Sequence, residues 1–318
     1  MRVLHFLFPP NIINFLFLMR KFFSYGPLLI VIAASLWAFD GIIRRSLYSL
    51  PSITIVFYEH LFGAAILLPY LILTFKKEGI TKKEFFLLLF ISMFSGVLGT
   101  LWFTTALLKT NFISFSVVYL IQKLQPIFAI SAAAIILKEK ITKSYIKWAV
   151  LALVAAYFVT FKNGIINLST GTGTVVAALY ALGAAFAWGS STALSKLALQ
   201  KRPSMYITAI RFFLTSILAF GMVLVLGQSK SLSAPSLSQL SRFLLIAVST
   251  GMFSVVIYYR GLKKVQANVS TILELVYPLL AVFIDATLYK SFLAPAQYVA
   301  GVILLFSIYK IAQIQQKK

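Results

Sequence analysis

The chain has 318 residues, of which 60% are hydrophobic and 11% are charged, and its formal net charge is +22. A soluble domain cannot bury this much apolar surface, so the composition is typical of an integral membrane protein. Because the basic residues punctuate apolar runs, as charges that orient membrane helices do, we expect no nucleic-acid partner.

The scarcity of cysteine and histidine argues against several kinds of site. The chain has no cysteine, which excludes disulfides, a catalytic thiol and cysteine metal sites. Its two histidines, His5 and His60, lie far apart in the sequence. We therefore expect no metal site, and nothing in the sequence indicates a cofactor.

Residues 1–24 are predicted to form an N-terminal extension. The first 18 residues are apolar, but Pro9 and Pro10 interrupt a run that is too short to cross a bilayer. The run also lacks the small-residue cleavage site of a removed signal peptide. We expect this extension to have no transport role.

Ten apolar segments of membrane-spanning length follow the extension. They are predicted at residues 26–47, 53–74, 85–108, 113–137, 144–161, 174–199, 205–227, 241–262, 267–289 and 294–312. Short connections that contain Pro, Gly, Ser or Lys separate them. This pattern predicts an all-α membrane protein with ten transmembrane helices.

Lysines and arginines concentrate in alternate connections. The richest of these are at residues 76–83, 138–147 and 196–202, on the same side of the predicted membrane as both termini. The opposite side has fewer basic residues, among them Arg44 and Arg45. Because cytoplasmic loops carry an excess of basic residues, we expect a multi-pass protein of the cell membrane with both termini in the cytoplasm.

The second half of the chain repeats the first half. Trp37 aligns with Trp188, and Pro126 aligns with Pro278. Four pairs of stretches match in order, namely 34–47 with 185–199, 55–67 with 208–218, 96–109 with 251–264, and 119–139 with 271–291. The sequence therefore predicts two five-helix repeats, at residues 25–165 and 172–313. Because each repeat has an odd number of crossings, the two would be inverted relative to each other, as in many secondary transporters.

These features resemble the EamA branch of the drug/metabolite transporter superfamily. The resemblance rests on the duplicated five-helix pattern, on the AxLWA-type opening of each half, and on the stretch LQPIFAISAAAIILKEKIT. Its most specific part runs from Pro126 to Glu139, and the second repeat departs from it with Ser291 in place of Glu139. The resemblance implies transport of small organic solutes without covalent chemistry or a cofactor, and it names no substrate.

Two prolines are predicted to kink the fourth and ninth segments. Pro126 and Pro278 lack an amide hydrogen, so each would free the carbonyl four residues earlier, which belongs to Gln122 or Glu274. A freed carbonyl in lipid must be buried in protein or line a wet cavity. The kinks therefore either pack against neighbouring helices or face a central substrate cavity, and the polar residue beside each kink favours the cavity.

Lys123 and Glu274 are expected to approach each other across the pseudo-twofold axis. They have opposite charges and occupy similar depths in the fourth and ninth segments. The alternative is a buried ion pair with a purely structural role. The candidate substrate-binding residues are Lys123, Glu274, Gln122, Tyr119, Trp37, Trp188 and Arg260. The tryptophans could instead be interfacial or packing residues, and Arg260 could extend its charge to the interface.

Other ionisable residues within the segments are candidates for proton coupling. Acidic residues and histidines are costly in a bilayer and often belong to proton pathways. The candidates are Glu274, Glu59, His60 and Asp285.

The predicted function is secondary active transport of a small organic solute by alternating access, with a cavity between the repeats. A lysine and a glutamate together would suit an amino-acid-like solute. The alternative is a membrane-embedded enzyme or a protein that handles a lipid-linked group. Such an enzyme would need a convergent set of catalytic residues, which the absence of cysteine, two separated histidines and only seven acidic residues disfavour. The expected partners are the substrate and the lipid bilayer, and the protein would be a monomer or a homodimer.

Overall fold

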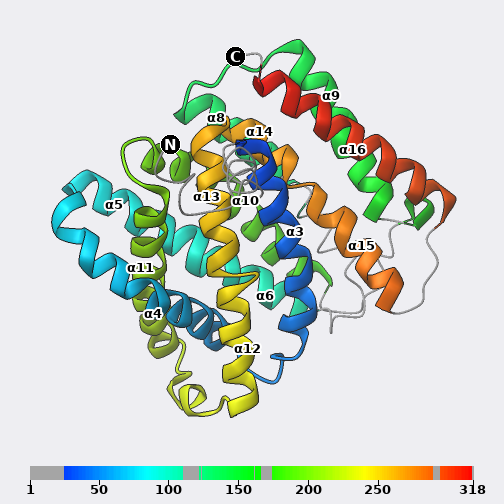
Figure 1. The fold of residues 1–318 in the computed structure, drawn as a ribbon. Coiled ribbons are helices and arrows are strands. Elements are labelled where there is room, and N and C mark those ends of the chain that lie inside the picture. The colour runs from blue at the N-terminus through cyan, green and yellow to red at the C-terminus, as the bar shows by residue number, and fades with distance from the viewer. Residues whose placement is uncertain are drawn as a thin grey trace, which may run out of the picture.

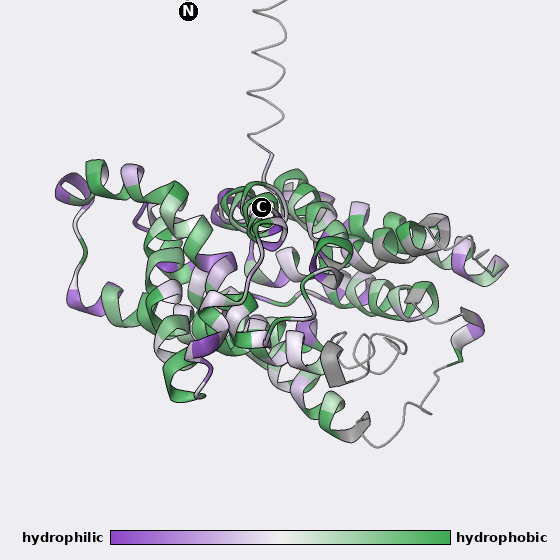
Figure 2. Cartoon of the chain, turned by 90° about the horizontal axis from the view of Figure 1, so that it is seen from below, coloured by the Kyte–Doolittle hydropathy of each residue, from purple (hydrophilic) through white to green (hydrophobic). Residues whose placement is uncertain are grey.

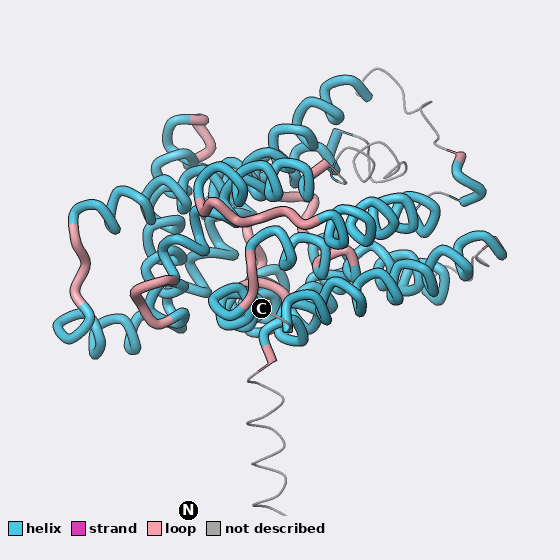
Figure 3. Tube along the Cα trace, turned by 90° about the horizontal axis from the view of Figure 1, so that it is seen from above, coloured by secondary structure: helices cyan, strands magenta, loops and turns pink. Residues whose placement is uncertain are grey.

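The computed structural model describes residues 25–109, 122, 124–160, 162–165, 174–288 and 294–316. Every regular element in these ranges is a helix, and short loops join the helices (Figure 3). This confirms the predicted all-α class. The N-terminal extension and most of the predicted fourth segment before Gln125 lie outside the described residues.

The helices follow the predicted segments along the chain (Figure 1). Those of the first half are α3 (Gly26–Arg45), α4 (Ser52–Glu78), α5 (Lys82–Ile91), η1 (Ser92–Gly99), α6 (Thr100–Lys109), α8 (Gln125–Ile136), α9 (Lys143–Thr160) and η2 (Lys162–Gly164). Those of the second half are α10 (Thr174–Leu199), α11 (Ser204–Val225), η3 (Ser229–Ser233), α12 (Leu237–Val248), α13 (Met252–Lys264), α14 (Ala267–Leu273), α15 (Val276–Leu288) and α16 (Pro295–Gln316).

Six helical stretches of the described chain are long and apolar enough to cross a membrane. They are Gly26–Arg44, Ser52–Glu78, Lys82–Ala106, Val176–Leu199, Ser204–Val225 and Leu237–Lys264. Two shorter apolar helices are Gln125–Ile136 and Pro295–Ile311. Hydrophobic residues predominate along the helices, as Figure 2 shows, and large apolar side chains such as Leu73 and Val225 are exposed. Such a surface is suited to contact with lipid.

The contacts between helices are equivalent in the two halves of the internal repeat. Helix α4 packs against its counterpart α11, and α9 packs against its counterpart α16. The packing of α3 against α13 and α15 is matched by the packing of α10 against α6 and α8. Exchanging the two halves therefore leaves the main contacts unchanged. In Figure 1 the start of α3 and the end of α16 lie at the same end of the bundle.

Two helices are irregular at the same place in the repeat. In the first half, η1 is a π-helix of eight residues. In the second half, α12 ends and α13 begins around a turn at residues 249–251, where Gly251 N–H donates to Ile246 O at 2.6 Å. Gly96 in η1 aligns with Gly251 in this turn. Because π-helical turns and helix breaks occur often at functional sites, these irregularities indicate that the interior between the halves is a candidate functional site.

Near the two prolines the backbone differs in part from the prediction that each proline frees the carbonyl four residues earlier. Pro126 lies in the first turn of α8, and a two-residue turn at Glu274 and Leu275 separates α14 from α15. The carbonyl of Glu274, which was expected to be freed by Pro278, accepts the Tyr277 N–H at 3.0 Å. A tighter turn thus satisfies this carbonyl, because a buried backbone acceptor is costly without a partner.

Glu139 connects the two halves beyond the end of α8. Its carboxylate accepts the Ala267 N–H at 2.7 Å and the Asn268 N–H at 3.0 Å. These amides begin α14 and have no partner within the helix, so a carboxylate there is favourable for both hydrogen bonding and the helix dipole.

Glycines allow several helices to approach closely. A Cβ on Gly189 of α10 would lie 2.6 Å from the Gln125 carbonyl oxygen and 3.1 Å from the Ala129 amide nitrogen. Both neighbours are backbone atoms of α8, which cannot move independently. By contrast, a Cβ on Gly221 of α11 would have no neighbour within 4 Å.

We expect Gly189→Ala to lower stability and Gly221→Ala to leave it unchanged or raise it slightly. Overpacking at Gly189 should cost about 1–3 kcal/mol, whereas the better helix propensity of alanine should contribute less than about 1 kcal/mol. Thermal unfolding of both purified variants in detergent measures the difference. Equal melting temperatures for the two variants would contradict the close contact between α8 and α10.

Candidate functional site

A central cavity of about 250 Å³ lies between the two halves. Its wall combines aromatic, charged and hydroxyl side chains from both repeats. The lining residues are Trp37, Asp40, Arg44, Glu59, His60, Ser95, Thr100, Phe103, Gln122, Gln125, Pro126, Trp188, Ser191, Thr192, Ser195, Arg211, Phe212, Thr250, Gly251, Val255, Tyr258, Tyr259, Thr271, Glu274, Leu275 and Tyr277. Both irregular helices contribute to this wall.

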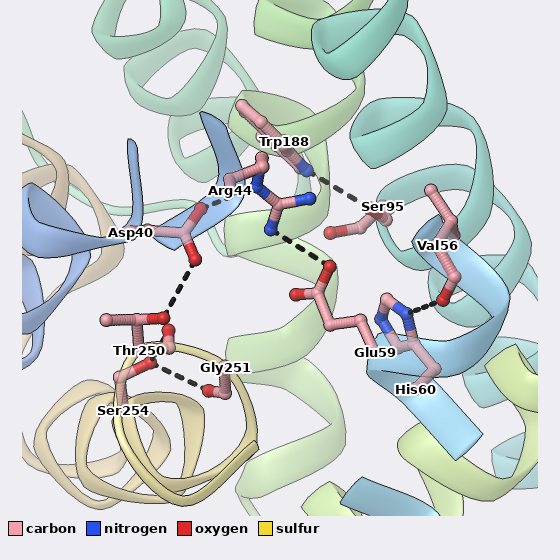
Figure 4. A network of polar contacts seen from close by, with 10 residues as sticks. All are labelled: Asp40, Arg44, Val56, Glu59, His60, Ser95, Trp188, Thr250, Gly251 and Ser254. Atoms are coloured by element: carbon pink, nitrogen blue, oxygen red, sulfur yellow. Dashed lines mark hydrogen bonds and ion pairs between the residues drawn. The ribbon is translucent and has the colours of Figure 1, made fainter. Parts of the chain in front are cut away.

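Arg44 is the centre of a buried charge network (Figure 4). Its Nε donates to Asp40 Oδ2 at 2.7 Å, and its Nη2 donates to Glu59 Oε2 at 2.9 Å. Asp40 also accepts the Thr250 hydroxyl at 2.8 Å. The network therefore links α3 and α4 to the turn between α12 and α13. One guanidinium faces two carboxylates, so these three side chains carry a net negative charge when all are ionised.

His60 lies beside this network on α4. Its side chain is buried, its Nδ1 donates to the Val56 carbonyl at 2.8 Å, and its ring centroid is 5.1 Å from that of Phe212 (Figure 4). The backbone bond sets the direction of the imidazole ring. His60 thus lines the same cavity as the carboxylates of Asp40, Glu59 and Glu274.

Aromatic rings form two pairs in the cavity wall. The Trp37 and Tyr258 ring centroids are 5.2 Å apart, and so are those of Phe103 and Trp188. The indole Nε1 of Trp188 donates to the Ser95 carbonyl at 3.1 Å. This bond to η1 orients the indole, so the ring is held in place rather than only packed against its neighbours.

Glu274 faces neutral hydrogen-bond donors among the described residues. Its Oε1 accepts the Tyr258 hydroxyl at 2.7 Å, and its Oε2 accepts the Gln125 amide at 3.3 Å. The carboxylate lies at the turn between α14 and α15, where the chain leaves regular helix geometry. It can therefore face the cavity from a break in the helix.

Arg211 enters the cavity from α11. Its Nη1 donates to the Tyr259 hydroxyl at 2.8 Å, and its Nη2 donates to the Ser95 hydroxyl at 3.0 Å. The guanidinium carbon is 5.5 Å from the centroid of the Tyr259 ring. Among the ion pairs of the described residues none includes Arg211, whereas Arg44 has two carboxylate partners.

The structure brings several of the predicted site residues to one cavity. These are Trp37, Glu59, His60, Gln122, Pro126, Trp188 and Glu274. Arg260 is exposed and does not line the cavity. Lys123 and Tyr119 lie outside the described residues, so the expected approach of Lys123 to Glu274 stays a prediction. Asp285 and Pro278 belong to α15, and their side chains are not described.

The prediction that Arg44 is a loop charge is wrong. The sequence pattern placed it among the basic residues of a connection, but its side chain is only 5% exposed. The spacing of four residues between Asp40 and Arg44 is the signal that was missed, because residues four apart share one face of a helix. Tyr258 and Thr250 gave no such signal, since only the folded chain brings their hydroxyls to acidic residues.

No group of three or more His, Asp or Glu side chains within the described part of the chain is arranged to hold a metal ion. Asp40 and Glu59 are instead bound to Arg44.

Comparison with known proteins assigns the chain to a family. The EamA-like transporter family matches it twice, over residues 24–161 and 175–313. This confirms the resemblance and the two-repeat organisation that the sequence predicts.

Two relatives are also named as transporters. The riboflavin transporter ImpX of Fusobacterium nucleatum is 34% identical over 298 residues, which are 91% of this chain and 98% of that protein. The uncharacterized transporter sll1164 of Synechocystis sp. is 26% identical over 240 residues, which are 72% of this chain and 66% of that protein.

A solved crystal structure shows the same fold at lower identity. It is 14% identical in sequence, has a TM-score of 0.72, and matches 92% of this chain and 98% of that chain. The family match and the ImpX relative, by contrast, extend over nearly all of both halves. The chain therefore belongs to the EamA-like transporter family, and it is a transporter rather than an enzyme.

Proposed function

We propose that this protein carries riboflavin, or a planar heteroaromatic solute of the same class, across the cell membrane. The observation that carries the proposal is the central cavity, whose wall combines aromatic rings with hydrogen-bonding side chains. The ImpX relative, named as a riboflavin transporter, supports the same substrate. The amino-acid-like solute suggested by Lys123 and Glu274 has weaker support, because the described partners of Glu274 are Tyr258 and Gln125.

The chemistry of riboflavin suits this cavity. Its ring system is flat, aromatic and uncharged, and it carries hydrogen-bonding groups along one edge and on a polyol chain. Flat rings bind favourably to aromatic side chains, and a few polar groups fix the orientation of a ligand in a mostly apolar site. The pairs formed by Trp37 with Tyr258 and by Phe103 with Trp188 supply the rings, and Asp40, Glu59 and Arg211 supply polar contacts.

Alternating access of two inverted five-helix repeats is the proposed mechanism. The exchange symmetry of the helix contacts supports it, because rocking of one half against the other can then open either side of a central site. The π-helix η1 and the turn at residues 249–251 both line the cavity, and both interrupt regular α-helix geometry there. Ten membrane crossings with both termini in the cytoplasm agree with the shared end of α3 and α16 in Figure 1.

This topology predicts opposite accessibility for two exposed positions. Because the chain has no cysteine, a single introduced cysteine is the only thiol that can react. In Ser233→Cys, at the end of η3 between α11 and α12, we expect labelling by a membrane-impermeant maleimide in intact cells. In Lys140→Cys, on the loop after α8, we expect labelling only after permeabilisation. The reverse result would place the termini outside the cytoplasm.

Uptake by a riboflavin-auxotrophic bacterium without its own riboflavin transporter tests the substrate. We expect the protein to restore growth at low riboflavin and to take up radiolabelled riboflavin. In Trp37→Leu the apparent affinity should fall about 2-fold to 10-fold, because an aromatic contact contributes about 0.5–1.5 kcal/mol.

The matched control is Trp148→Leu. Trp148 lies on α9 with its ring centroid 5.5 Å from that of Phe306, and it does not line the cavity. Its uptake should equal that of the wild type once expression is equal. Growth and uptake no greater than with an empty vector would refute riboflavin as the substrate.

We further propose that Glu274 couples transport to protons, because it lines the cavity with neutral donors as its described partners. In proteoliposomes, Glu274→Gln should abolish riboflavin accumulation driven by an imposed pH gradient. Exchange of labelled for unlabelled riboflavin should persist, since exchange needs no net proton movement. Glu78→Gln, at the end of α4 and outside the cavity, should retain both activities. Gradient-driven accumulation at the wild-type level in Glu274→Gln would exclude this role.

A further inference from the structure

We propose that Arg211 determines substrate specificity by binding the paired hydrogen-bond acceptors on the dicarbonyl edge of a flavin ring. This inference rests on the proposed function, since it assigns a role to one residue in recognising that substrate. It concerns a residue that the sequence pattern did not place among the candidate ligands.

The charge of Arg211 is balanced differently from that of Arg44. Arg44 binds two carboxylates, at 2.7 Å and 2.9 Å. The partners of Arg211 among the described residues are the hydroxyls of Tyr259 and Ser95. A guanidinium in a poorly solvated site is favourable only when its donors are satisfied, so this group can donate further hydrogen bonds to a substrate.

One donor of Arg211 has no acceptor in the described structure. Its Nε atom is buried and makes no hydrogen bond. Leaving such a donor unpaired is costly. Because the guanidinium is planar and its Nη atoms carry further hydrogens, it can present two parallel N–H groups to two acceptors in one plane.

The guanidinium is already held in position before a substrate binds. Tyr259, which accepts from Nη1, is itself 2.9 Å from the Ser195 hydroxyl, so α11, α13 and α10 are linked. Ser95, which accepts from Nη2, belongs to η1. A fixed binding group loses little conformational entropy when a ligand arrives, which increases affinity.

The indole ring of Trp188 lies near the Arg211 guanidinium, because both side chains bind Ser95. The Ser95 carbonyl accepts the Trp188 indole N–H, while the Ser95 hydroxyl accepts from Arg211 (Figure 4 shows the indole contact). A flat ring that packs on Trp188 would therefore lie close to the guanidinium. The flavin ring suits this arrangement because each carbonyl oxygen lies beside a ring nitrogen that also accepts hydrogen bonds.

Comparison of two tricyclic ligands in the purified protein tests the proposal. Lumiflavin has the flavin ring without the polyol chain, and phenazine has a similar three-ring plane without the two carbonyl groups. Binding of each is measured by quenching of tryptophan fluorescence. We expect the wild type to prefer lumiflavin by about 10-fold or more, since hydrogen bonds to a charged group contribute about 1.5–3 kcal/mol.

In Arg211→Met and Arg211→Lys we expect most of this preference to be lost while phenazine still binds, which also shows that the cavity remains folded. Lysine keeps the charge but not the planar pair of donors. Arg260→Met, in an exposed position on α13, should keep the wild-type preference.

Two outcomes overturn the proposal and differ in what they imply. If Arg211→Met weakens both ligands equally or leaves the preference unchanged, the residue does not recognise the dicarbonyl edge, and riboflavin transport is unaffected as a proposal. If the wild type binds neither lumiflavin nor riboflavin, the proposed substrate fails and this inference fails with it.

Discussion

A buried charge in an apolar helix bundle is costly unless it is paired or hydrogen-bonded, and the pairs formed by Arg44 meet this requirement in the structure. The Arg44 side chain is buried and bridges Asp40 and Glu59, so it connects α3 to α4. Through Asp40 and Thr250 the same network reaches the turn between α12 and α13. Removal of Arg44 would leave the carboxylates of Asp40 and Glu59 without a cationic partner, which is strongly destabilising. The polar cavity thus depends on a network that also joins the two halves.

The two repeats share a backbone plan but differ in the charges they bring to the cavity. Glu59 aligns with Arg211, and Gln122 aligns with Glu274. The helix contacts of the two halves are equivalent, whereas the carboxylates of Asp40 and Glu59 face a guanidinium and Arg211 faces hydroxyls. Symmetric packing therefore agrees with the proposed alternating access, and the asymmetric charge would let the proposed site orient an asymmetric solute.

The sequence predicted part of the site because aligned interruptions of apolar runs are visible in one dimension. Glu274, Gln122 and Trp188 line the cavity, as expected for polar and aromatic residues at repeat-related positions. Arg44 was assigned to a loop because hydropathy does not distinguish a basic residue at a helix end from one that turns inward. Arg260 is exposed, and Arg211 occupies the cavity instead. The direction in which an arginine extends depends on its neighbours in the fold, and hydropathy alone does not encode it.

Composition, hydropathy and internal repetition by themselves determined the helical membrane class, the duplication and the family resemblance. These properties follow from apolar segment length and from residues that align at a nearly constant spacing, so one chain suffices to establish them. Tertiary structure decided which side chains meet. The contacts of Tyr258 with Glu274 and of Arg211 with Tyr259 join different helices. Hydrogen bonding and charge pairing between packed helices set those contacts, because only packing brings a donor within reach of its acceptor.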